Sequence, residues 1–81
     1  MAEATGYTGK QGQYLSFIYH YTKLNRRAPA ERDMQDFFDV TPPTVHQMVV
    51  KLEQKRLITR TPGQSRSIRL LLERDQLSDL D

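Results

Sequence analysis

The sequence predicts a mainly α-helical domain that ends in a small β-hairpin. Three observations support this prediction. Apolar residues recur at helical spacing in three segments, and a tight Thr-Pro-Pro break separates the second segment from the third. After position 56 the pattern changes to short β-type runs around a Pro-Gly turn. Three helices, a tight turn before the third and a hairpin after it describe a winged helix-turn-helix, three helices plus a wing.

The first helix is expected to follow Thr8, a good N-cap residue. Asn25 is expected to end it, because Asn tolerates the left-handed conformation of a C-cap, and Pro29 prevents its continuation. Residues 1–7 are predicted to be a flexible leader to a domain of residues 8–72. The apolar residues of this helix that are expected in the core are Tyr14, Phe17, Ile18 and Tyr21.

A short second helix is expected after Pro29. Glu31 and Asp33 would lie in its first turn, where negative charge favours the positive end of the helix dipole. Met34 and Phe38 are spaced by four residues and therefore share one face, which we expect to point inward.

The third helix, residues 42–56, has the clearest pattern. Thr41 is the expected N-cap, and Pro42 suits the first helical position because its missing N–H would be unpaired there. One apolar stripe at positions i, i+3, i+4 and i+7 consists of Val45, Met48, Val49 and Leu52. Val50 lies on the opposite face, where a binding partner explains an apolar side chain better than water does.

Two β-type runs follow, residues 57–61 and 67–71, and Pro62-Gly63 begins the turn between them. Their alternation predicts an antiparallel hairpin with three core residues, Ile58, Ile68 and Leu70. Three residues are expected to point outward, namely Thr59, Ser67 and Arg69. Residues 73–81 are predicted to be an acidic tail or linker.

Charge is distributed unevenly along the chain. The net charge is +2, yet residues 1–72 contain eleven basic and six acidic residues, whereas residues 73–81 contain one basic and four acidic residues. A basic body favours an anionic partner, most commonly nucleic acid for a small domain of this kind.

Composition excludes several other classes. The chain has no Cys, so it has no disulfide, no thiolate zinc site and no cysteine nucleophile. It lacks a run of about 20 apolar residues and a secretion signal, so we expect a cytoplasmic protein without a membrane partner. Neither a nucleophile elbow nor a Gly-rich phosphate loop is present, and we expect no enzyme activity, cofactor, metal or small-molecule ligand.

Several segments resemble the DNA-binding domain of LexA-type repressors, and the resemblance covers residues 8–72 without an obvious gap. The most specific segment is the wing, Pro62-Gly63-Gln64-Ser65-Arg66-Ser67-Ile68-Arg69-Leu70. The other similar segments are Thr8-Gly9-Lys10-Gln11, Ala28-Pro29-Ala30, Pro43-Thr44-Val45-His46 and Lys51-Leu52-Glu53-Gln54-Lys55-Arg56-Leu57-Ile58. Arg56 departs from the family, which usually has Gly there.

The resemblance implies sequence-specific binding of a double-stranded DNA operator by a LexA-like transcriptional repressor. Helix 42–56 would read the major groove, and the wing would contact the backbone or minor groove. The base-reading positions that the family implies are Thr41, Pro43, Thr44, His46 and Gln47. Gln47 can pair with adenine, and Val50 can meet a thymine methyl. Enterobacterial members have acidic residues at positions 46 and 47, so a different operator is expected.

Six further residues are expected to contact the DNA backbone or to act from the wing: Lys51, Lys55, Arg60, Ser65, Arg66 and Arg69. Arg66, near the tip of the wing, is also a candidate for insertion into the minor groove. Two alternatives stay open, since Lys55 could complement the helix dipole and Arg69 could pair with Glu73.

Other functional alternatives also stay open. The fold could serve as a protein-protein interaction module without DNA binding, and Tyr19 and Phe37, both expected on outward faces, could form a self-association patch. A homodimer is a further expectation, because one small domain reads a single half-site weakly. LexA proteins continue into a self-cleaving Ser-Lys peptidase domain, whereas this sequence ends at Asp81, so self-cleavage is not expected of it.

Overall fold

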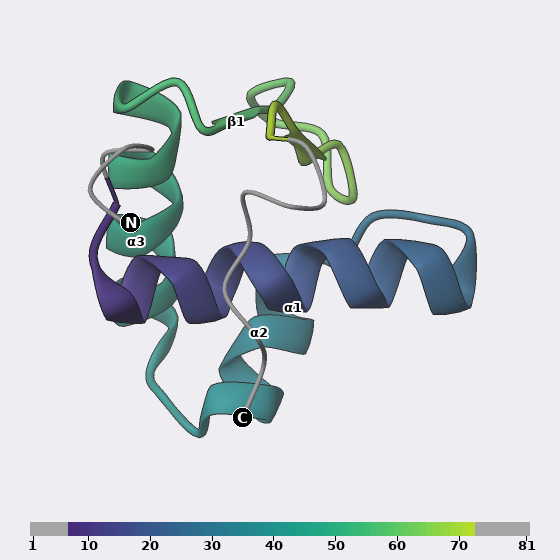
Figure 1. Cartoon of the computed structure of the whole chain (residues 1–81). Coiled ribbons are helices and arrows are strands. Elements are labelled where there is room, and N and C mark those ends of the chain that lie inside the picture. Colours follow the sequence, from purple (N-terminus) through teal and green to yellow (C-terminus); the bar gives the residue numbers. More distant parts are fainter. Residues whose placement is uncertain (1–6, 73–81) are drawn as a thin grey trace.

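The computed structural model describes residues 7–72 and contains three helices followed by a two-stranded sheet (Figure 1). The elements are α1 (Gly9–Asn25), α2 (Glu31–Phe38), α3 (Pro42–Gln54), β1 (Ile58–Thr59) and β2 (Arg69–Leu70). In Figure 1, α3 stands upright at one end of the horizontal α1, and the hairpin lies above α1. This arrangement confirms the winged helix-turn-helix. Residues 1–6 of the expected leader, and the expected acidic tail, lie outside the described residues.

Helix α1 begins as predicted, at a reciprocal capping box. The N–H of Gln11 donates to Thr8 Oγ1 at 3.2 Å, and the N–H of Thr8 donates to Gln11 Oε1 at 3.0 Å. The prediction for its C-cap is wrong by one residue, because Arg26 adopts the left-handed conformation (φ 58°). Asn25 stays helical, and its side-chain amide donates to the carbonyl of Tyr21.

Helix α2 has the expected acidic first turn. The N–H of Ala30 donates to Asp33 Oδ2 at 2.8 Å, so this carboxylate satisfies a backbone donor at the start of the helix. Met34 is fully buried, while Phe38 is half-buried and stacks on Tyr14 with 4.1 Å between ring centroids. Asp39 ends the helix with a left-handed backbone (φ 55°).

Helix α3 begins at Pro42 as predicted but ends at Gln54, two residues earlier than expected. Arg56 adopts a left-handed backbone (φ 62°), and this residue turns the chain toward β1. Thr41 occupies the N-cap position without a side-chain capping bond, since its hydroxyl pairs with that of Thr44 at 2.9 Å. Of the apolar stripe, Met48 is only partly buried, whereas its three other members are fully buried.

The core lies between the three helices and the hairpin, with α2 packed against α3 and β2 against α1. Tyr7 is only 8% exposed, so the last residue of the expected leader belongs to the core. Tyr21, expected in the core, is only partly buried at its edge. The buried residues are Tyr7, Tyr14, Leu15, Phe17, Ile18, Met34, Val45, Val49, Leu52, Leu57, Ile58 and Ile68.

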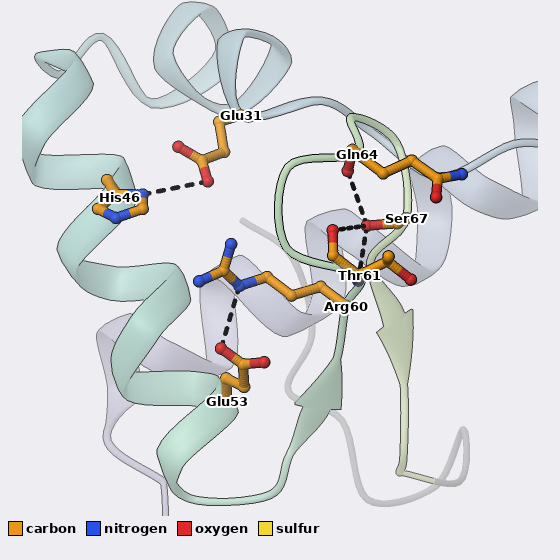
Figure 2. Close-up of polar contacts among 7 residues, drawn as sticks. All are labelled: Glu31, His46, Glu53, Arg60, Thr61, Gln64 and Ser67. Atoms are coloured by element: carbon orange, nitrogen blue, oxygen red, sulfur yellow. Dashed lines mark hydrogen bonds and ion pairs between the residues drawn. The ribbon is translucent and has the colours of Figure 1, made fainter.

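The wing strands are shorter than the expected five-residue runs: Ile58 pairs with Leu70 and Thr59 with Arg69 in antiparallel register, and the N–H of Leu71 donates to the carbonyl of Leu57 at 3.0 Å. Ser67, which is expected to point outward, is partly buried. Its hydroxyl accepts from the N–H of Thr61 at 2.9 Å and lies 2.8 Å from the carbonyl of Gln64 (Figure 2). Hydrogen bonds of this side chain thus take the place of further strand pairing.

Among residues 7–72, no helix has the length and apolar character needed to cross a membrane.

Candidate nucleic-acid interface

The N-terminal half of α3 presents a polar surface. Five predicted base-reading residues are exposed there: Thr41, Pro43, Thr44, His46 and Gln47. Their position on α3 follows from the burial of Val45 and Val49, which turns the intervening residues outward. Val50 differs from the expectation, because it is partly buried and so presents less apolar surface than a fully exposed valine would.

A carboxylate from α2 lies beside this surface. Glu31 Oε2 is 3.4 Å from His46 Nδ1, and the His46 side chain remains 56% exposed (Figure 2). The two residues are fifteen positions apart, so helical spacing could not reveal the contact. Glu31 was identified in the sequence only as a dipole-stabilising residue. The structure places it where it restrains a predicted base-reading side chain.

A second acidic residue pairs with a predicted backbone contact. Arg60 Nε donates to Glu53 Oε1 at 3.0 Å, which joins the residue after β1 to the last turn of α3 (Figure 2). The Arg60 side chain is 20% exposed. Lys51, two residues earlier in the same last turn of α3, is exposed and forms no ion pair with any of residues 7–72. Lys51 is therefore more available to an anionic partner than Arg60.

Lys55 holds α3 against α1. Its Nζ donates to Gln11 Oε1 at 2.8 Å, and the same Gln11 oxygen accepts the N–H of Thr8 in the capping box of α1. The sequence left open a phosphate contact or a dipole role for this lysine. The structure shows a link between two helices across 44 positions of sequence.

The loop between β1 and β2 carries two predicted residues, one exposed and one directed inward. Ser65 is exposed. The guanidinium of Arg66 instead points to the helical body, where Nη1 lies 3.1 Å from Tyr21 Oη, 3.2 Å from the carbonyl of Ala28 and 3.1 Å from Asp33 Oδ2. This geometry differs from the exposed cation that the sequence predicted.

The surroundings of the Asp33–Arg66 contact shift the pKa of both residues. Burial raises the pKa of Asp33, but hydrogen bonds from the Ala30 N–H and from Tyr21, together with the charge and hydrogen bond of Arg66, bring it below its ordinary value. The hydrogen bond to Tyr21 is the main cause that raises the pKa of Arg66. The carboxylate and the guanidinium therefore both remain charged at neutral pH.

A basic pocket lies between the end of α1 and the wing. It has a volume of about 390 Å³, and no acidic residue lines it. Its arginines are Arg26, Arg27, Arg66 and Arg69. Arg26 and Arg27 carry no local sequence signal for such a contact, because they precede the helix-turn-helix and only the packing of α1 against β2 brings them beside the wing. Predicted Arg69 is exposed on β2.

Among the described residues, the expected outward aromatic residues are only partly solvent-facing. Phe37 is 49% exposed, and its ring centroid is 4.6 Å from that of Phe17. Tyr19 is partly buried and contacts His20 edge to face. A self-association patch at these residues stays a prediction.

The fold and this surface agree with sequence comparisons. The family model for the LexA DNA binding domain matches residues 4–67. The chain belongs to the LexA DNA-binding domain family. The resemblance seen in the sequence is thereby confirmed over most of its extent.

Two relatives of this family are similar to the chain. The LexA repressor of Thermosipho melanesiensis is 40% identical over 70 residues, and that of Thermosipho africanus is 39% identical over 71 residues. These alignments include 86% and 88% of this chain but 35% and 36% of the relatives. The chain thus spans about a third of the length of these LexA repressors.

Proposed function

We propose that the chain binds double-stranded DNA sequence-specifically and acts as the operator-reading part of a LexA-like transcriptional repressor. The observation that carries this proposal is the match of residues 4–67 to the LexA DNA-binding domain. The exposed polar surface of α3, beside a basic wing, supports it independently.

In this proposal α3 enters the major groove with its N-terminal half. Gln47 would pair with an adenine edge, while Thr44 and His46 would contact neighbouring bases. Lys51 would contact a phosphate, because it is exposed and unpaired within residues 7–72. These contacts position α3 and read the sequence, and repression would follow from occupation of the operator without chemistry on the DNA.

The wing would approach the DNA backbone or the minor groove beside the major groove that α3 enters. Ser65 is exposed in its loop, and Arg69 lies with Arg26 and Arg27 around the basic pocket. The absence of carboxylates from that pocket lining suits contact with a DNA phosphate. Arg60 would need to exchange Glu53 for a phosphate in order to take part.

Selection of random duplex DNA by the purified chain at about 0.1 M salt tests the proposal, since phosphate-dominated binding remains measurable under such conditions. We expect enrichment of a defined half-site, or of two half-sites in inverted repeat. Absence of enrichment, together with absence of binding at low salt, would exclude DNA binding and favour a protein-interaction module.

A further inference from the structure

Arg66 joins three parts of the molecule to the wing. Its Nη1 lies within 3.2 Å of acceptors from α1, from the segment between α1 and α2, and from α2, namely Tyr21 Oη, the Ala28 carbonyl and Asp33 Oδ2. These partners are 45, 38 and 33 positions away in the sequence. The Arg66 side chain is 32% exposed and that of Asp33 is 26% exposed, so water competes only partly for the contact.

Asp33 has two functions at once. Its Oδ2 accepts the N–H of Ala30 at the start of α2 and also contacts Arg66 Nη1. Because α2 packs against α3, this one oxygen connects the wing to the helix-turn-helix unit. The lowered pKa of Asp33 agrees with a carboxylate that stays ionised in this position.

The pairing within the wing is short, so contacts with the helical body place its loop, and the Asp33–Arg66 contact adds to the burial of Ile68 and to the Arg60–Glu53 ion pair. Strands β1 and β2 contribute two residues each, and such a small ladder is marginally stable without outside contacts. The hydroxyl of Ser67 closes the loop internally, but its partners Thr61 and Gln64 belong to the wing itself. These hydrogen bonds of Ser67 do not orient the wing relative to α2 or α3.

We propose that Arg66 is a positioning residue that, through Asp33, holds the wing at a set place relative to α3 and is not itself a phosphate contact. The inference rests on the proposed function, because the position of the wing matters when α3 and the wing bind one duplex together. A wing that is already placed loses less conformational freedom on binding than a mobile one, so the tether favours affinity.

Three variants test the inference on the full chain. Arg66→Lys keeps the charge, and lysine serves well as a phosphate contact, but it lacks the planar guanidinium that reaches several acceptors. Arg66→Gln removes the charge. Asp33→Asn keeps an oxygen for the Ala30 N–H and removes the partner charge of Arg66. Asp36→Asn, exposed on the same helix, is the matched control.

We expect Arg66→Lys, Arg66→Gln and Asp33→Asn each to weaken binding of a selected duplex about three- to tenfold, which is the order of the cost of immobilising one side chain on binding. The slope of log K against log salt should stay unchanged in all three, whereas Lys51→Gln should lower it by about one. Asp33→Asn makes the chain more positive, so simple electrostatics predicts tighter binding. Weaker binding of Asp33→Asn, at unchanged binding of Asp36→Asn, would therefore show that Asp33 acts by positioning the wing.

Amide {1H}-15N relaxation of Thr61 and of residues 63–65 without DNA separates this inference from the proposed function. Increased mobility of these amides in Arg66→Lys and Asp33→Asn, at an unchanged fold of the helices, supports the tether even if no variant binds DNA. Wild-type affinity of Arg66→Lys, together with a slope lowered by about one in Arg66→Gln, would show a phosphate contact and overturn the proposal. Unchanged wing amides in all variants would overturn it as well.

Discussion

Four non-glycine residues of the described chain have a left-handed backbone: Arg26, Asp39, Arg56 and Arg66. Such residues place Cβ too close to the following carbonyl, which costs roughly 1–2 kcal/mol. Arg56 is the clearest case, since it turns the chain between α3 and β1 at a position where the resemblance to LexA-type repressors implies a Gly. The corner adopts this geometry despite its steric cost, because Leu52 and Leu57 on either side of it are buried.

Arg56→Gly is therefore expected to stabilise the fold. Glycine removes the steric cost of φ 62° but adds flexibility to the unfolded chain, so the net gain in the free energy of unfolding is up to about 1 kcal/mol. Urea denaturation measures it. Arg56→Ala keeps the Cβ and serves as the control. An equal gain in unfolding free energy in both variants would show that the side chain of Arg56 beyond its Cβ, and not the left-handed backbone, destabilises the fold.

Asp33 should make stability depend on pH in the acidic range. Its pKa is lowered in the folded chain, so it adds stability at pH values above the ordinary Asp pKa of about 3.9, and this stability is lost as pH falls through the lower folded pKa. The unfolding free energy of the wild type should exceed that of Asp33→Asn at neutral pH, and the difference should shrink below about pH 4. A difference that stays undiminished as the pH falls below the ordinary Asp pKa of about 3.9 would contradict this assignment.

At the scale of elements, α2 shapes the reading surface of α3. Glu31 brings a negative charge next to His46, and α2 thereby restrains a side chain that the proposed function assigns to base contact. The acidic first turn of α2 was predictable from the sequence as a dipole effect. Its second role depends on how α2 packs against α3, which the local pattern does not specify.

Glu31→Gln should tighten DNA binding, because it removes a carboxylate that competes with DNA for His46 and repels phosphates. Exposed pairs are worth at most about 1 kcal/mol, so the gain should not exceed about fivefold. Competition binding against the selected duplex measures it. Asp36→Asn makes the same change of charge on the same helix and is the control. An equal effect of both variants would show that net charge, and not the Glu31–His46 contact, accounts for the tighter binding.

At the scale of the whole molecule, one domain presents one α3 and one wing, and therefore one half-site. On the proposed function, a duplex with two half-sites in inverted repeat should bind two copies of the chain, and their spacing should follow the helical repeat of DNA. Sedimentation of the complex gives the stoichiometry. Equal affinity for the first and second copy would indicate independent domains, whereas tighter second binding would indicate contact between copies.

Most of the architecture was predictable because its signals are local. Thr8 with Gln11, Pro42 at the start of α3, and the Pro62-Gly63 turn specify element ends within three or four residues of sequence. The family could be inferred for the same reason, since its most specific segment is a continuous stretch in the wing. The errors at Asn25 and at the end of α3 are small, because several residues can adopt the left-handed end of a helix.

The packing of the elements against one another sets which cations face outward and which are engaged. Lys55, Arg60 and Arg66 look alike in the sequence as candidate phosphate contacts, yet each is paired with another side chain in the fold. Lys51 remains exposed. Helical and strand periodicity determine which face of an element a residue occupies, but a pairing across 33 or 44 positions depends on how the elements pack. Long-range electrostatic pairing is a property of the packed chain, and no local spacing encodes it.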